Sequence, residues 1–226
     1  MDRDLSQLVW LALLWGLYGV LHSVLATHWL KAWVGRRWPA LLPAYRLGFN
    51  VLAVLLFLPP YLLMKAWDGP LLWQWEGAER WLVNGIAVAA LLAFLHTLLE
   101  YDLATFAGTR QWRERARHAV PLLAEPDRLR LGWQHRHVRH PWYFLALLLI
   151  WTQPMDAAFL LSALVWTVYL LIGLRFEEQK LVRQFGEAYR RYQQRVPALL
   201  PRPWRRLGAA EALELEALAQ QAEEAE

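Results

Sequence analysis

Cysteine is absent from this chain of 226 residues, and charged residues are few. Without cysteine the chain has no disulfide, no thiolate metal site and no cysteine nucleophile. Charged residues make up 19% of the sequence and hydrophobic residues 57%, whereas a soluble protein of this size needs more polar surface. The chain also has 15 Trp, a residue that gathers where lipid meets water. This composition predicts an integral membrane protein.

Basic residues outnumber acidic ones, which leaves a net charge of +4 and a pI near 9.6. In a membrane protein, such an excess is typical of loops that face a cytoplasm lined with anionic lipid. Nucleic-acid binding is a weaker interpretation because the arginines flank apolar runs. We therefore expect the lipid bilayer, and no nucleic acid, as a partner.

Long uncharged runs predict the membrane helices. Three runs have no formal charge: Leu8 to Ala26, Leu47 to Met64 and Trp81 to Leu99. The first covers roughly 28 Å at about 1.5 Å per residue, close to the thickness of the hydrocarbon core. We expect this run to be retained, because no small-residue cleavage site of a signal peptide follows it.

A longer run, Pro141 to Leu174, has Asp156 as its one charge, and residues 153–156 near its middle read as a turn. It predicts a hairpin of two helices with a short first arm. Because open backbone cannot face lipid, helices are the expected structure throughout. We therefore predict an all-α polytopic membrane protein with about five transmembrane helices, the last two forming the hairpin.

Lysine and arginine are unevenly distributed among the loops. They gather after the first run, after the third run and after the hairpin, whereas only Lys65 and Arg80 lie between the second and third runs. The positive-inside rule then places the N-terminus outside and the C-terminus in the cytoplasm. We expect the bacterial inner membrane.

Beyond the hairpin, apolar residues recur at spacings of three and four: Leu181, Phe185, Tyr189, Tyr192 and Val196. This pattern predicts a cytoplasmic amphipathic helix that ends before Pro197 and lies against the membrane or the protein body. We expect one membrane domain, residues 1–207, followed by an acidic tail, residues 208–226. The tail is interpreted as a solvated helix or as disordered, without an assigned function.

Two charged clusters border the hairpin. His135 to Pro141 stands at its entrance and Arg175 to Glu178 at its exit. Because a hairpin brings its ends together, several cations and two carboxylates are expected to share one pocket on the cytoplasmic side. The alternative is that the basic residues only anchor the helix at the interface and the two glutamates only face solvent.

The entrance cluster also allows a metal hypothesis. His135, His137 and His140 are spaced as imidazole ligands, as in membrane di-iron oxidases. Such sites need several histidine clusters, and the other histidines are isolated. We therefore predict no metal site, and a metal oxidoreductase ranks last among the hypotheses.

The second half of the chain closely resembles the isoprenylcysteine carboxyl methyltransferase family, whose superfamily includes phospholipid methyltransferases. The shared motifs are an RHP-x-Tyr entrance, an EE-x-x-L exit, an FG-x-x-Tyr-x-x-Tyr segment, Val-Pro and Leu-Pro. They occur at Arg139 to Tyr143, Glu177 to Leu181, Phe185 to Tyr192, Val196-Pro197 and Leu200-Pro201. Three further segments are similar to the methanethiol S-methyltransferase-like subgroup. They are Leu21-His22-Ser23-x-x-Ala26, Tyr45-Arg46-Leu47-x-x-Asn50 and Trp151-x-x-Pro154-Met155.

The resemblance implies S-adenosylmethionine as cofactor, bound in a cofactor half of about residues 131–203. Arg139 and His140 would hold its carboxylate, the two glutamates would accept from its ribose hydroxyls or ammonium, and Trp142 and Tyr143 would offer aromatic faces. The cofactor-binding residues implied are His135, His137, Val138, Arg139, His140, Pro141, Tyr143, Glu177 and Glu178. The catalytic residues implied are Arg175 and Glu178.

The leading hypothesis is a membrane methyltransferase whose small apolar or lipid-like acceptor arrives from the bilayer. A thiol such as methanethiol is the first candidate, and a prenylated or phospholipid acceptor is the second. His22 and His96 would line the acceptor path or join helices by hydrogen bonds.

The chain departs from the family at Trp133, Gln134 and His135, and at Leu145, where the family has glycine. These departures leave a second hypothesis, a non-catalytic membrane scaffold that keeps the fold.

Overall fold

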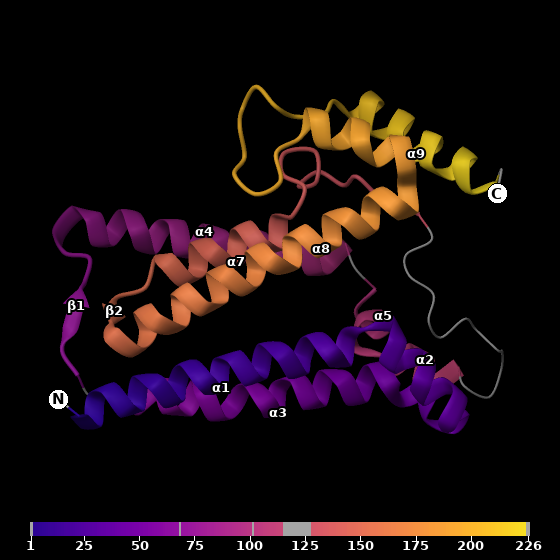
Figure 1. Ribbon diagram of the computed structural model, residues 1–226. Helices are drawn as coiled ribbons and strands as arrows, with labels where there is room; N and C mark the ends of the chain where they lie inside the picture. Colours follow the sequence, from indigo (N-terminus) through magenta and orange to yellow (C-terminus); the bar gives the residue numbers. More distant parts are fainter. Residues whose placement is uncertain (1, 68, 101, 115–127, 225–226) are drawn as a thin grey trace. The chain divides into compact units, whose positions relative to one another are not determined.

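The computed structural model describes residues 2–67, 69–100, 102–114 and 128–224, and these residues are mostly helical (Figure 1). The helices are α1 (Asp2–Ala26), α2 (His28–Arg37), the 3₁₀ helix η1 (Pro39–Ala44), α3 (Tyr45–Lys65), α4 (Gly77–Glu100), α5 (Leu103–Ala107), α6 (Thr109–Glu114), α7 (Pro141–Trp151), α8 (Ala157–Arg195) and α9 (Ala209–Glu224). The strands are β1 (Leu71–Trp73) and β2 (Met155–Asp156). The predicted all-α class is confirmed.

Four of the described helical segments are long and apolar enough to cross a membrane: Asp4–Ala26, Pro39–Lys65, Gly77–Leu98 and Ala157–Arg195. In the most apolar stretch of each segment, at most 17% of the residues are buried within the protein, so most side chains are available to contact lipid. The predicted short first arm of the hairpin is α7, whose 11 residues extend about 16 Å, less than a full crossing needs. The chain is a polytopic membrane protein, and its orientation stays a prediction.

The chain divides into two compact units, one formed by residues 1–124 with 152–166 and the other by residues 125–151 with 167–226. Each unit has its own buried cluster. The prediction of a single domain followed by a tail stays a prediction.

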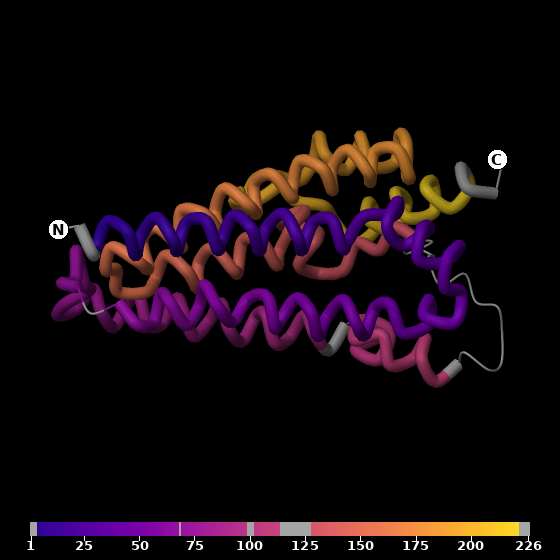
Figure 2. Tube along the Cα trace, turned by 60° about the horizontal axis from the view of Figure 1, so that its bottom comes forward, coloured from indigo at the N-terminus to yellow at the C-terminus, as the bar shows by residue number. Residues whose placement is uncertain are grey.

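In the first unit, α1 and α3 run side by side (Figures 1 and 2). Their shared core is largely aromatic: the buried Trp15 ring packs edge-on against Phe57 at 5.1 Å and against Trp166 at 4.8 Å. Trp15 Nε1 donates to Ser162 Oγ at 2.8 Å, so the indole N–H buried in this core is paired. His22 lies in the same row of rings, beside Tyr18.

The N-terminal motif at residues 45–50 closes the ends of helices in this unit. Tyr45 Oη donates to the Leu25 carbonyl at 2.7 Å, near the end of α1. Asn50 Nδ2 donates to the carbonyls of Phe106 and Ala107 at the end of α5, 3.2 Å away in each case. The last carbonyls of a helix have no partner within it, so these side chains supply the missing donors.

The turn of the hairpin contains two features that the sequence pattern did not predict. Strand β2 pairs antiparallel with β1, which lies more than 80 positions earlier in the chain. Asp156 Oδ1 accepts from Phe159 N at 2.7 Å, as the N-cap of a helix does. The one charge in the long apolar run therefore starts α8.

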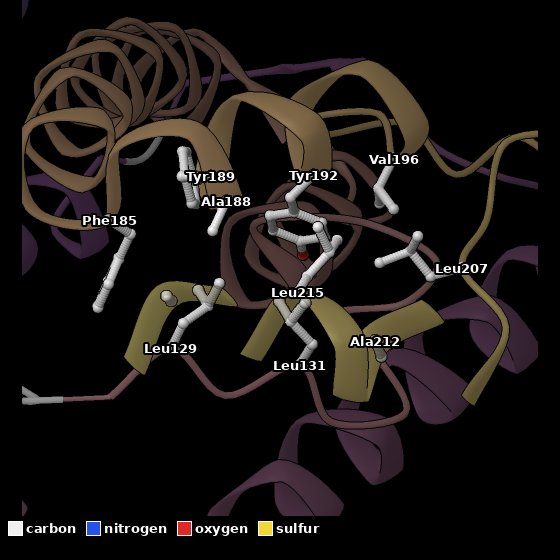
Figure 3. Packing of buried hydrophobic residues seen from close by; sticks show 11 residues of the cluster. Leu129, Leu131, Phe185, Ala188, Tyr189, Tyr192, Val196, Leu207, Ala212 and Leu215 are labelled. Atoms are coloured by element: carbon white, nitrogen blue, oxygen red, sulfur yellow. The ribbon is translucent and has the colours of Figure 1, made fainter. Parts of the chain in front are cut away.

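The core of the second unit is formed by α8, α9 and the segment before α7 (Figure 3). The predicted amphipathic face is confirmed: Phe185, Tyr189, Tyr192 and Val196 are buried, and Leu181 packs beside them. This face lies on the protein body, one of the two expected alternatives. The non-helical backbone of Gly186 divides α8 into two helices, and the second of these contains the predicted segment and ends at Arg195, before Pro197.

The acidic tail forms the helix α9, as one of the two expected alternatives had it, but this helix is not simply solvated. One side of α9 is buried in the core of the second unit through Ala212, Leu215 and Ala219. Figure 3 shows Leu215 and Ala212 of α9 opposite Tyr192 and Val196 of α8. The opposite side exposes residues such as Leu213. The tail thus contributes to the core that surrounds the C-terminal part of α8.

Candidate functional site

The site lies in the second unit, where the entrance segment of the hairpin runs beside the segment that follows α8. Arg139 N donates to the Pro197 carbonyl at 2.9 Å and His140 N to the Ala198 carbonyl at 3.0 Å. Proline at position 141 then begins α7, where a missing N–H has no cost. These hydrogen bonds fix the backbone from which the side chains of Arg139 and His140 project.

Arg139 and Glu178 form a bidentate ion pair. Arg139 Nε donates to Glu178 Oε1 at 2.9 Å, and Nη2 donates to Oε2 at 2.7 Å. The two side chains are only 10% and 12% exposed. The predicted meeting of the entrance and exit clusters is therefore observed, and two parallel charge-assisted bonds define its geometry.

His140 lies between the two glutamates. Its Nε2 donates to Glu178 Oε1 at 2.7 Å, and its Nδ1 lies 3.4 Å from Glu177 Oε2. Burial lowers the pKa of His140, but hydrogen bonds to Glu177 and Glu178 and the charges of both carboxylates raise that pKa above its ordinary value. The ring of Tyr143 stacks on the imidazole at 5.4 Å.

Glu178 has two further donors, both from the end of α8. Tyr189 Oη donates to Oε1 at 2.7 Å and Gln193 Nε2 donates to Oε2 at 2.6 Å. Helical spacing predicted Tyr189 on an apolar face, and Gln193 was not among the predicted site residues. The phenolic hydroxyl of a tyrosine on a buried face was a usable signal, since it needs a partner there. Nothing in the sequence pattern singled out Gln193.

The other predicted residues lie around this cluster. The His135 carbonyl accepts from Tyr192 Oη at 2.6 Å, and His137 Nδ1 lies 2.9 Å from the Trp133 carbonyl. Val138 and Pro141 are buried, whereas Arg175 is exposed one turn before Glu178. Among the residues that the structure describes, no group of three or more His, Asp or Glu side chains is arranged to hold a metal ion. The ring nitrogens of His140 face carboxylates, and Nδ1 of His137 faces a carbonyl.

An open depression adjoins the Glu178 carboxylate. Its volume is about 380 Å³, and it is lined by Glu178, Gln179, Val182, Arg183 and Gln193. Its walls come from α8 on both sides of Gly186 and carry carboxylate, amide and guanidinium groups. The Arg183 guanidinium suits an anionic group of a ligand, whereas the Glu178 carboxylate already accepts from protein donors.

Comparison with known proteins yields two kinds of relative. Methanethiol S-methyltransferase 2 of Bradyrhizobium diazoefficiens is 34% identical over 203 residues, which cover 84% of this chain and 71% of that protein. Methanethiol S-methyltransferase of Pseudomonas deceptionensis is 34% identical, with coverages of 82% and 69%. Nurim of Rattus norvegicus is 32% identical, with coverages of 89% and 77%. No family model and no solved structure matches the chain.

Proposed function

Because this chain belongs to the family of the methanethiol S-methyltransferases and nurim, we propose that it is a membrane methyltransferase that uses S-adenosylmethionine to methylate a thiol such as methanethiol. The observation that supports the site most directly is the bidentate pair of Arg139 and Glu178, which joins the two motifs that border the hairpin. A prenylated or phospholipid acceptor is the second candidate.

The groups at the site suit the chemistry of S-adenosylmethionine. This cofactor has a cationic sulfonium, an ammonium, a carboxylate, two ribose hydroxyls and an adenine. Glu177, whose side chain is 45% exposed, offers carboxylate oxygens for the hydroxyls or the ammonium. Arg183 in the depression offers a guanidinium for the carboxylate, and Tyr143 offers an aromatic face. These groups match the charges and hydroxyls of the cofactor; Arg183 lines the depression, whereas Glu177 and Tyr143 lie beside His140 in the neighbouring cluster.

Arg139 and His140, which the resemblance assigns to the carboxylate of the cofactor, are bonded here to the two glutamates. Their direct contact with the cofactor stays a prediction, as do the contacts of His135, His137, Val138 and Pro141. Arg175 is exposed on α8 and is proposed to orient the acceptor. Glu178 is proposed to fix the geometry of both cations.

When bound, S-adenosylmethionine supplies an electrophilic methyl group on a sulfonium. The residues of this chain then have to align the acceptor sulfur with that methyl group and keep water away. The cofactor would supply its methyl group to the acceptor sulfur as its own sulfur–methyl bond breaks; it would leave as the neutral thioether, and the thiol proton would pass to bulk solvent. We place this site at the cytoplasmic face of a bacterial inner membrane, where a small apolar acceptor arrives through the lipid.

The scaffold hypothesis is not favoured, since several of the relatives are named as methyltransferases. The departure at Leu145 lies on α7, where this side chain is 7% exposed. It therefore packs in the protein and does not project into solvent.

The test uses the purified full-length chain in detergent. Titration calorimetry measures the binding of S-adenosylmethionine, and a cofactor with a labelled methyl group measures transfer to methanethiol, a prenylcysteine and a phospholipid. We expect binding and transfer to the thiol, with Glu178→Gln strongly impaired and the surface variant Glu187→Gln unchanged. A folded wild-type chain that neither binds the cofactor nor transfers its methyl group would remove the proposal.

A further inference from the structure

The end of α8 folds back onto its own middle. In a straight helix, Tyr189 and Gln193 would lie roughly 16 and 22 Å along the axis from Glu178, at about 1.5 Å per residue. In the structure both side chains contact the Glu178 carboxylate, at 2.7 and 2.6 Å. The helix must therefore change direction between these residues.

The change of direction occurs at Gly186, whose backbone has φ 52° and ψ −125°. Residues with a Cβ rarely adopt this conformation, whereas glycine does so without strain. A Cβ placed on Gly186 would meet no atom within 4 Å. The requirement for glycine therefore comes from the backbone conformation and not from a close neighbour.

The folded-back segment, residues 187–198, is bonded to the entrance of the hairpin as well. Arg139 Nη1 donates to the carbonyls of Gln193 and Val196, in the first case at 3.2 Å. Tyr189 is 1% exposed, so its hydroxyl reaches Glu178 from within the core. The segment thus touches both partners of the central ion pair.

Glu178 receives two bonds from Arg139 and one each from His140, Tyr189 and Gln193. An ionised carboxylate has about four lone-pair directions. These five donors leave no acceptor direction for a ligand. Glu178 therefore acts on a ligand through the groups that it holds.

We infer that Tyr189 and Gln193 are positioning residues of the cofactor site: they lock the Glu178 carboxylate, which in turn sets Arg139 and His140 beside the depression. This inference rests on the proposed function. It assigns a role to the folded-back segment, which completes the site from a part of the chain beyond both charged motifs. Gly186 is the position that makes the arrangement possible.

The first test is a double-mutant cycle. Tyr189→Phe and Gln193→Met are each made in the wild-type chain and in Glu178→Gln, and both the Kd for S-adenosylmethionine and kcat/KM are measured. Hydrogen bonds to a charged group have effects of about tenfold or more, so we expect about a tenfold loss in the wild-type background. In the Glu178→Gln background we expect less than about a twofold loss, because the group that they hold is gone.

Matched controls are available in the chain. Tyr61→Phe changes a partly exposed tyrosine on α3, and Gln194→Met changes the exposed neighbour of Gln193. Both controls are expected to equal the wild type. If Tyr189→Phe and Gln193→Met match their controls in an active enzyme, the inference is overturned while the proposed function stands. Equal losses in both backgrounds would also overturn it, because the residues would then act independently of Glu178.

The second test needs no cofactor. The amides of Arg139 and His140 donate to carbonyls that follow the folded-back helix, so they should exchange slowly with solvent deuterium. Gly186→Ala is expected to speed their exchange at least about tenfold and to leave the amides of α1 unchanged. Unprotected amides in the wild type would overturn the inference. If the wild type instead fails to bind S-adenosylmethionine, the proposed function fails. The deuterium exchange of the Arg139 and His140 amides then decides by itself whether the folded-back segment holds these two residues in place.

Discussion

Replacing Glu178 with glutamine tests how much the Arg139–Glu178 ion pair contributes to the free energy of unfolding. The substitution keeps the size of the side chain but removes its charge, and it places an N–H₂ where at least one donor now points. The guanidinium of Arg139, in a side chain 10% exposed, loses its counter-charge. Removing one partner of a buried ion pair costs about 3–5 kcal/mol.

The side chains of Arg139 and Glu178 are still about a tenth exposed, so water can replace part of the lost interaction. We therefore expect the free energy of unfolding to fall by about 3 kcal/mol, the lower end of that range. For a chain of this size, about 1 kcal/mol corresponds to roughly 2–4 °C in Tm. Thermal unfolding of the full chain in detergent at about pH 6 should therefore show Glu178→Gln melting roughly 6–12 °C below the wild type.

Glu187→Gln is the matched control. Glu187 pairs with Arg191 at 3.1 Å on the surface of the same helix, where the two side chains are 58% and 59% exposed. Exposed pairs of this kind contribute about 0.5 kcal/mol or less. If Glu178→Gln lowers Tm no more than Glu187→Gln does, the bidentate pair does not stabilise the second unit and the reasoning is refuted.

Three other predictions concern stability. His140 has a raised pKa, so the folded chain binds more protons than the unfolded chain above about pH 6.5; Tm should fall as pH rises through this window, and His140→Gln should flatten the profile. Leu215→Ala should cost about 3 kcal/mol in chemical denaturation, whereas Leu213→Ala, at a position 65% exposed, should cost less than about 0.5 kcal/mol. Gly108→Ala should lower the free energy of unfolding by at least about 1–3 kcal/mol, because φ is 84° and the new Cβ would lie 2.7 Å from a backbone nitrogen. Its Tm should therefore fall, whereas Gly16→Ala, whose Cβ would enter open space, should keep the Tm of the wild type.

The membrane helices could be predicted from the sequence because their cause is local. A run of about twenty uncharged residues must satisfy its backbone groups by itself in lipid, and only a helix does so. The runs beginning at Leu8, Leu47 and Trp81 accordingly lie within α1, α3 and α4. The buried face of Tyr189 and Tyr192 followed from helical periodicity for the same reason.

Features that join distant segments were not predictable in this way. Strand β1 pairs with β2 across more than 80 residues, and neither strand is long enough to show a pattern of its own. The buried side of α9 looked like part of a solvated tail, because alanine and leucine among glutamates show no partner until the opposite surface is known. Gln193 looked like any polar residue of a helix surface.

The sequence by itself determined which charged residues border the apolar spans, because charges avoid lipid and a hairpin must return its ends to one side. Arg139, His140, Glu177 and Glu178 were identifiable on that basis. Only the tertiary structure decided how they bond to one another and that Tyr189 and Gln193 join them. The reason is that the path of the chain after Gly186 depends on the non-helical backbone of this glycine and on packing against α9. Neither can be predicted from the local pattern of residues.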